Sequence, residues 1–265
     1  MNIQDKVVVV TGGASGIGRA MARRFAADGA RAVVIADLDQ SQASAAADEI
    51  GGLGVACDVS VAEQVEALVA RATRQYGAVH VFCSNAGIST GAGLEPSLDV
   101  WQRNWDVNLM AHVHAAHAVL PQMLARGEGY LLQTASAAGL LTSVTSATYS
   151  VSKHATVAFA EWLAIHYGDR GVRVSCLCPQ GVVTPMLVGK QGERKSFLTE
   201  GAMSPEDVAA EVVRCMQEER FLVLPHPEVL KFMQRKTGDY DRWIAGMRKV
   251  RDKAEAVRTG QATQP

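Results

Sequence analysis

The chain has 265 residues, of which 48% are hydrophobic and 20% charged, and its formal net charge is −1. That balance is ordinary for a globular protein with ample core material, and the near-zero charge argues against a nucleic acid or an anionic membrane as partner. No apolar run is long enough to span a bilayer, the first residues lack signal-peptide features, and the five scattered cysteines suit a reducing compartment, so we expect a cytoplasmic protein.

Short runs of β-branched residues alternate along the chain with longer, alanine-rich amphipathic segments. The runs predict strands at 6–10, 32–36, 54–57, 79–83, 129–133, 173–178 and 221–224. The segments between them predict helices at 17–28, 40–50, 61–76, 100–124, 149–167 and 205–218. Strands that are apolar throughout and separated by helices are typical of a parallel sheet covered on both faces. We therefore expect one α/β domain over residues 1–265.

A glycine-rich turn at 11–18 joins the first predicted strand to the first predicted helix. Its glycines would let the backbone approach the pyrophosphate of a dinucleotide, which would meet unpaired N–H groups at the helix N-terminus. The spacing is not the commoner G-x-G-x-x-G, and a purely structural turn is the alternative. Its position between strand and helix favours a dinucleotide. The expected contacts are Gly12, Ser15, Gly16, Ile17 and Gly18.

Asp37 ends the second predicted strand, where an acid can accept hydrogen bonds from the adenosine ribose. Its carboxylate would repel the extra phosphate of NADP, and the glycine turn carries no basic residue to attract that phosphate. We therefore predict NAD as cofactor. Further expected contacts are Leu38 beside Asp37, Asp58 and Val59 around the adenine, and Asn85, Ala86 and Gly87 at the end of the fourth strand.

Tyr149 and Lys153 stand four residues apart in a predicted helix and so share one face. Free tyrosine and lysine have pKa values of ~10 and ~10.4, and neither is a useful acid or base alone at neutral pH. A neighbouring ammonium favours the phenolate, so we expect Lys153 to lower the pKa of Tyr149. The spacing alone is weak, because such pairs arise by chance on helix surfaces.

An ordered set of motifs resembles the short-chain dehydrogenase/reductase family between about residue 6 and residue 224. The set comprises the turn at 11–18, Asp58-Val59, Asn85-Ala86-Gly87, Asn108, Ser136, Tyr149 with Lys153, and the segment 179–184. Ser136 and Tyr149 also stand at the family's usual interval. The resemblance implies a single-domain, Rossmann-type, doubly wound fold with about seven parallel strands. It also implies a homotetramer or, less often, a dimer.

The resemblance implies a catalytic tetrad of Asn108, Ser136, Tyr149 and Lys153. Tyr149 would exchange a proton with the substrate oxygen, and Lys153 would lower its pKa and bind the nicotinamide ribose. Ser136 would hydrogen-bond the substrate oxygen and so hold the reacting carbon near the nicotinamide. Asn108 would hold a water that links Lys153 to solvent.

The segment 179–184 departs from the family's usual Pro-Gly-x-x-x-Thr, because Gln180 stands where glycine is usual. Pro179, Val182 and Thr184 keep the cofactor-contacting positions implied by the family. The departure puts substrate contacts in doubt more than the chemistry. Gln180 and Met186 join Ser136 and Tyr149 as the candidate substrate contacts.

Two regions fall outside the strand and helix alternation. Residues 185–203 are polar and glycine-containing and follow a strand end, which indicates a lid over the substrate. The tail at 225–265 carries Tyr240, Trp243 and Met247 at helical spacing. We expect a helical extension there that packs either on its own domain or on a neighbouring subunit.

Three histidines, His112, His114 and His117, raise the alternative of a zinc site. His112 and His114 would face opposite ways on a helix, and no acid or thiol completes a set, so we predict a structural or interface role and no metal. Cys176 and Cys178 share one face of a strand, and buried thiols are favoured over a redox pair.

The leading prediction is an NAD-dependent dehydrogenase that oxidises a secondary alcohol to a ketone. Small and apolar residues around the expected centre indicate a moderately hydrophobic substrate: alicyclic, aromatic or steroid-like. One alternative is an NADPH-dependent ketoreductase, which Asp37 disfavours. The other is a non-catalytic dinucleotide-binding regulator, which the presence of both Tyr149 and Lys153 disfavours.

Overall fold

Parallel strands form a single sheet at the centre of the molecule. The computed structural model describes residues 1–90, 93–189, 191–192 and 196–259. The strands lie in the order β3-β2-β1-β4-β5-β6-β7, and every pairing between neighbours is parallel. Their bounds are β1 Val7–Thr11, β2 Ala32–Asp37, β3 Leu53–Ala56, β4 Val81–Ser84, β5 Gly129–Thr134, β6 Val172–Leu177 and β7 Leu222–Val223. The predicted seven-stranded, doubly wound α/β sheet is therefore confirmed.

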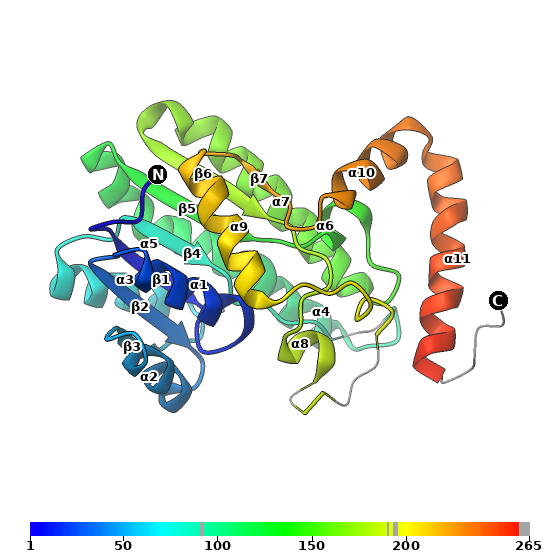
Figure 1. The fold of residues 1–265 in the computed structure, drawn as a ribbon, viewed down its shortest axis with the longest axis horizontal. Helices are drawn as coiled ribbons and strands as arrows, with labels where there is room; N and C mark the ends of the chain where they lie inside the picture. The colour runs from blue at the N-terminus through cyan, green and yellow to red at the C-terminus, as the bar shows by residue number, and fades with distance from the viewer. Residues whose placement is uncertain (91–92, 190, 193–195, 260–265) are drawn as a thin grey trace.

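Helices cover both faces of this sheet (Figure 1). Their bounds are α1 Gly16–Ala27, α2 Gln40–Asp48, α3 Ala62–Tyr76, α4 Leu98–Trp105, α5 Ala111–Arg126, α6 Ala138–Leu141, α7 Ala147–Tyr167, α8 Pro185–Val188, α9 Pro205–Gln217, α10 Glu228–Gly238 and α11 Tyr240–Thr259. None of the described helices combines the length and the hydropathy that a bilayer span requires.

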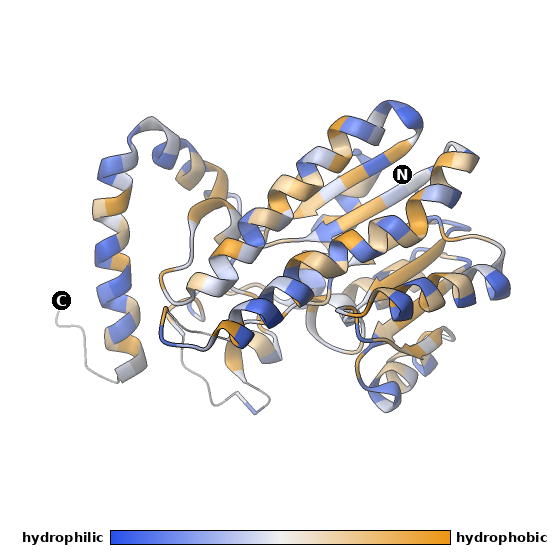
Figure 2. Ribbon diagram, turned by 180° about the vertical axis from the view of Figure 1, so that it is seen from behind, coloured by the Kyte–Doolittle hydropathy of each residue, from blue (hydrophilic) through white to orange (hydrophobic). Residues whose placement is uncertain are grey.

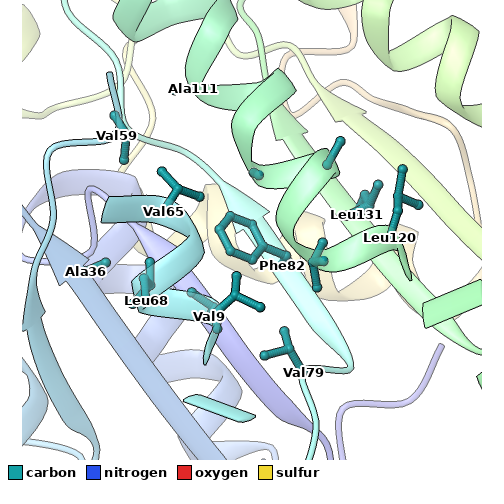
Figure 3. Close-up of a cluster of buried hydrophobic side chains, with 14 of the residues drawn as sticks. Val9, Ala36, Val59, Val65, Leu68, Val79, Phe82, Ala111, Leu120 and Leu131 are labelled. Atoms are coloured by element: carbon teal, nitrogen blue, oxygen red, sulfur yellow. The ribbon is translucent and has the colours of Figure 1, made fainter. Parts of the chain in front are cut away.

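Alternate residues of each strand contribute to two separate hydrophobic cores, because successive side chains of a strand point to opposite faces of the sheet. Val9 of β1 points to the face covered by α3, α5 and α7, whereas Val8 and Val10 point to the face covered by α1, α2 and α9. Figure 3 shows the first core, where Phe82 of β4 lies among Val9, Val65 and Leu131. Complete burial of such a side chain contributes about 1.5–3 kcal/mol, so the strand positions are strongly fixed.

The single helix predicted at 100–124 is interrupted. A π-helical turn, Asp106–Met110, separates α4 from α5. Asn108 lies in this turn, and its carbonyl oxygen accepts a 2.6 Å hydrogen bond from Thr156 Oγ1 of α7. In a regular helix that carbonyl oxygen would accept from its own helix, whereas here it also accepts from a neighbouring helix. Such π turns are frequent at functional sites.

The tail is a pair of helices rather than one. α10 leads away from the end of β7, and α11 runs down the side of the molecule beyond the carboxyl ends of the strands (Figure 1). α10 packs on its own domain through a third, small hydrophobic cluster with Val229 at its centre. In Figure 2, α11 is mainly hydrophilic with isolated hydrophobic turns. The two predicted alternatives concern the stripe of Tyr240, Trp243 and Met247, which lies on α11, so the packing of α10 does not decide between them.

Candidate active site

A cavity of about 2090 Å³ opens at the carboxyl ends of the strands. β1 lies between β2 and β4 there, so the chain order reverses at this point of the sheet. Ligands of open α/β sheets bind at such a reversal. Nearly all of the predicted site residues line this cavity. The exceptions are Gly18 and Asn108, which lie behind its surface.

The conformation of the glycine turn requires glycine at three positions, where a side chain would be strained or would clash. Gly12 and Gly16 have φ values of +61° and +51°, in the region that favours glycine. A Cβ on Gly12 would lie 2.9 Å from Ala86 Cα, and one on Gly18 would lie 2.2 Å from the Gly12 carbonyl oxygen. The Ser15 side chain does not cap α1. The turn therefore presents backbone N–H groups to the cavity, as a pyrophosphate requires.

Thr11 ties the glycine turn to the end of β4, a role that the sequence analysis missed. Its Oγ1 accepts hydrogen bonds from the Asn85 and Ala86 backbone N–H groups at 3.0 and 3.2 Å. The Asn85 side chain returns a 3.1 Å bond from Nδ2 to the Thr11 carbonyl oxygen. The position of Thr11, directly before two glycines, was the only signal for this role in the sequence.

Two acids stand at the adenosine end of the cavity. The Asp37 carboxylate accepts from the backbone N–H groups of Ala14 at 3.0 Å and Leu38 at 2.8 Å. Its negative charge is thus held at the cavity edge. Asp58 accepts from the N–H and the hydroxyl of Ser60, which fixes the turn before α3. Both acids line the cavity together with Leu38 and Val59.

Ser136, Tyr149 and Lys153 meet on one wall of the cavity, although they come from the end of β5 and from α7. Lys153 is almost fully buried, and its Nζ donates a 2.8 Å hydrogen bond to the carbonyl oxygen of Thr134. The same Nζ lies 5.7 Å from the centre of the Tyr149 ring. The predicted helical pair is therefore formed, and it points inward rather than into solvent.

The pKa values at this wall differ from the sequence prediction. Burial raises the pKa of Tyr149, and the hydrogen bond from Ser136 only partly offsets that effect. Burial also lowers the pKa of Lys153 to about 8. The expected lowering of the tyrosine pKa by Lys153 is therefore not produced by the protein residues alone. The ammonium is directed at Thr134, and burial outweighs its charge.

Asn108 is fully buried, and both polar atoms of its side chain are engaged. Its Oδ1 accepts from the Ile88 N–H at 2.9 Å, and its Nδ2 donates to the Ile88 carbonyl oxygen at 3.0 Å and to Ser152 Oγ at 3.1 Å. A Cβ on Gly87 would lie 3.3 Å from Asn108 Oδ1 and 3.4 Å from Lys153 Nζ. Asn108 thus fixes the chain after Gly87 close beside Lys153.

The segment after β6 accommodates its unusual Gln180 through a residue that the sequence analysis missed. The Gln180 N–H donates to Nδ1 of His226, a buried side chain between β7 and α10, at 3.2 Å. Gly181 is required by close packing, because a Cβ there would lie 2.3 Å from the Leu198 carbonyl oxygen. Thr184 then brings the segment back to the glycine turn, since a Cβ on Gly16 would lie 3.0 Å from its methyl group.

The remaining predicted regions divide between the cavity and the core. Within the predicted lid, Met186 and Phe197 line the cavity, while residues 190 and 193–195 lie outside the described part of the chain. His112 is buried against Gln133, and His114 contacts the Val59 carbonyl oxygen. Among the described residues, no three metal-ligating side chains gather. Cys176 and Cys178 are buried with sulfurs 3.7 Å apart.

Comparison with known proteins places this site in a family. The family profile described as short chain dehydrogenase matches residues 6–195. A 1-deoxy-11-beta-hydroxypentalenate dehydrogenase of Streptomyces exfoliatus is 38% identical, with 86% of each chain covered. A mitochondrial borneol dehydrogenase of Lavandula x intermedia is 34% identical, with 84% of this chain and 88% of that one covered.

Solved structures give the same result. A short-chain dehydrogenase/reductase from Burkholderia phymatum, in complex with NAD, superimposes with a TM-score of 0.83 at 31% identity and covers 91% of this chain and 96% of its own. The profile match spans most of the chain, and relatives above 30% identity span more than two thirds of it. The protein therefore belongs to the short-chain dehydrogenase/reductase family and is an oxidoreductase of hydroxy compounds.

Proposed function

We propose that this protein is an NAD-dependent dehydrogenase that oxidises an alicyclic secondary alcohol to its ketone and can run in reverse. One observation carries the proposal. The cavity joins a buried wall of Ser136, Tyr149 and Lys153 at one end to the glycine turn and Asp37 at the other. A proton-transferring group and a dinucleotide site therefore open onto the same volume.

Tyr149 is the proton-transferring residue of this proposal. In the reductive direction its O–H donates to the forming alkoxide, and its raised pKa keeps that proton in place until it is needed. Ser136 donates a hydrogen bond to the same substrate oxygen and holds the reacting carbon in position. Lys153 keeps its ammonium beside the tyrosine and the nicotinamide ribose, while Asn108 positions the chain next to it and is the expected water-holding residue.

A bound NAD+ would accept the hydride, and the positive charge of its nicotinamide ring would favour the phenolate. The residues of the cavity fit such a cofactor. Gly12, Gly16 and Gly18 shape a turn that a Cβ would obstruct, and the backbone N–H groups there suit a pyrophosphate. The expected holders of the nicotinamide carboxamide, Val182 and Thr184, line the same cavity.

Asp37 supports NAD rather than NADP. Its carboxylate is fixed by two backbone N–H groups at the cavity edge, so it cannot easily turn away from an incoming phosphate. The NAD bound to the Burkholderia phymatum relative is consistent with this preference. The alternative of an NADPH-dependent ketoreductase would require that phosphate to approach a fixed negative charge. A non-catalytic regulator remains the alternative of another class, and the intact Ser136, Tyr149 and Lys153 wall counts against it.

The substrate is proposed from the cavity lining and from the relatives. Leu141, Val144 and Met186 give the site an apolar surface near Tyr149, and residues 185–203 are the expected cover over it. Two relatives are named for the oxidation of hydroxypentalenate and of borneol, which are ring alcohols. A moderately hydrophobic alicyclic alcohol fits both observations better than a linear one.

We also propose a homotetramer or dimer in the cytoplasm. α7 carries Val151, Trp162 and Ile165 with 48%, 47% and 77% of their surfaces exposed, and such apolar groups support contact with a second copy. The five free and buried cysteines suit a reducing compartment. Light scattering of the purified protein would test the assembly, and a monodisperse monomer at micromolar concentration would contradict it.

The test of the activity is an assay of NADH absorbance with a panel of secondary alcohols. We expect turnover of cyclohexanol and borneol with NAD and much slower turnover with NADP. Equal rates with the two cofactors would favour the ketoreductase alternative. Tight NAD binding with no turnover of any alcohol or ketone would favour the non-catalytic regulator.

A further inference from the structure

The C-terminal helix α11 faces the catalytic wall across the cavity. Trp243, Met247 and Val250 line the same volume as Tyr149, although they come from the far end of the chain. We propose that these three side chains form the distal wall of the substrate site and select an alcohol with more than one fused or bridged ring. The inference rests on the proposed function, since it concerns the substrate of that same site.

The apolar side chains of α11 form a stripe that is turned toward the cavity. Trp243, Met247, Val250 and Ala254 recur at intervals of four, three and four, which places them on one face of a helix. Ala254 is only 7% exposed, and the other three are partly buried. Tyr240 and Ile244, at the margin of that stripe, are 55% and 45% exposed and do not line the cavity. The charged residues of α11 that also line the cavity are Arg242, Arg251 and Glu255.

The helices that carry this wall pack against the segment that follows Ser136. In the third hydrophobic cluster, Val229 of α10 is fully buried with Ala137 and Leu141, which directly follow Ser136 in the chain. Lys236 Nζ of α10 donates a 2.7 Å hydrogen bond to the Leu140 carbonyl oxygen. The Phe232 and Trp243 rings, 6.5 Å apart between centres, continue the contact into α11. The distance between the distal wall and the catalytic serine is thus set by direct packing.

The chemistry of this wall suits a rigid hydrocarbon. The cavity of about 2090 Å³ exceeds the ~300–1,000 Å³ of an ordinary small-molecule site, and the glycine turn, Asp37 and Asn85 claim only one end of it. At the other end, an indole, a thioether and a branched aliphatic side chain offer broad, adaptable apolar contact. In this proposal a single ring bound at Tyr149 makes less contact with α11 than a bicyclic frame does. Selection between them then falls on Met247 and its neighbours.

The experiment compares variants that fill the cavity with one that adds the same bulk at a position of α11 outside the cavity lining. Met247→Trp and Val250→Trp narrow the cavity, while Ile244→Trp adds an indole at an exposed position that does not line it. We expect kcat/KM for borneol to fall roughly tenfold or more in the first two, as a misfit in an apolar site predicts. The ratio of kcat/KM for borneol to that for cyclohexanol should fall with it in these two variants and keep its wild-type value in Ile244→Trp. Val250→Trp carries the test if Met247→Trp does not fold.

A binding measurement separates this inference from the proposed function. Borneol is titrated calorimetrically into the protein saturated with NADH, so no turnover is needed. A dissociation constant that rises roughly tenfold in Met247→Trp, with that of Ile244→Trp unchanged, supports the distal wall. Equal constants in all proteins, or no borneol binding by the wild type, would overturn it. Oxidation of cyclohexanol by the wild type would still uphold the proposed function in that case.

Discussion

The two walls of the cavity face each other but are held in place by different means. The wall of Ser136, Tyr149 and Lys153 belongs to the sheet and α7, and buried hydrogen bonds such as that from Lys153 to Thr134 fix it. The opposite wall, α11, is joined to the domain through the small hydrophobic cluster around Val229, and much of its surface is exposed to solvent. Local stability follows buried contacts, so the first wall is the rigid one and α11 the yielding one. The proposed proton transfer therefore belongs to the rigid wall, and the proposed selection of substrate belongs to the yielding wall.

Removing the reactive group from the rigid wall should have the largest effect. Tyr149→Phe deletes the hydroxyl and leaves the ring, so turnover should fall by about 10²- to 10⁴-fold, the usual contribution of general acid–base catalysis. NADH affinity, measured by fluorescence titration, should not change. Tyr240→Phe, at an exposed position of α11 that does not line the cavity, is the matched control and should retain full activity. A Tyr149→Phe variant that stays active would remove this tyrosine from its proposed role.

The second-largest effect should come from Asp37, at the adenosine end of the cavity, and should appear in the preference for NAD over NADP. Asp37→Asn removes the charge that opposes the NADP phosphate, and preference for NAD should fall roughly 10- to 100-fold, as expected for hydrogen bonds to a charged group. The control is Asp39→Ser, which removes a charge two residues away. Serine is a good N-cap, so it preserves the cap that Asp39 provides to α2. Equal loss of preference in both variants would show that only the overall charge matters.

Acid should destabilise the fold through His112, a buried side chain close enough to Lys153 of the rigid wall to feel its charge. Burial and the nearby Lys153 lower the pKa of His112 to about 3, so the unfolded chain binds the proton more readily than the folded one. The stabilisation is complete above the unfolded pKa of ~6.5 and is lost as the pH falls toward 3. Between pH 7 and pH 5 the wild type should lose about 2 kcal/mol of unfolding free energy through this group.

Urea unfolding at the two pH values measures that loss. His112→Gln replaces the imidazole with a side chain that does not titrate, so its stability should change less with pH than that of the wild type. His117→Gln, at an exposed position of the same helix, should keep the wild-type slope. Parallel slopes for the wild type and His112→Gln would show that the buried imidazole is not the acid-sensitive group.

The smallest effect should come from loosening the yielding wall. Lys236→Met removes the hydrogen bond to the Leu140 carbonyl oxygen, which should cost about 0.5–1.5 kcal/mol. Hydrogen exchange should quicken in α10 and α11 and stay slow in the sheet. Lys231→Met, an exposed position on the same helix, should change neither. If hydrogen exchange in the sheet also becomes faster, the two walls unfold together, and the proposed difference in their local stability is wrong.

Much of the sheet could be predicted because each strand is a short apolar run between helices. The run at 6–10, for example, became Val7–Thr11, and the predicted fold class is confirmed. The ordered motifs also indicated residues that the fold brings to one cavity, including Asp37 and Ser136. Both predictions depend on the spacing of residues along the chain, which determines local structure directly.

What escaped prediction depends on contacts between distant segments. His226 accepts from the Gln180 N–H across the end of the sheet, and no spacing in the sequence links the two. The π turn around Asn108 keeps nearly the apolar pattern of a regular helix, so 100–124 appeared continuous. The pKa of Tyr149 is raised by burial, whereas the sequence predicted that Lys153 would lower it. The prediction failed because a helical spacing does not show how deeply a side chain is buried.

The small hydrophobic cluster around Val229 also bears on how this enzyme could be re-engineered. α10 and α11 share few side chains with the two main cores, and the chain enters them once, after β7, which is the last strand among the described residues. A designer can therefore exchange residues 228–259 as a cassette, provided that Val229 and Lys236 keep their contacts with the segment after Ser136. Libraries confined to that cassette would explore new alcohols while leaving the two main cores and the proposed catalytic wall unchanged.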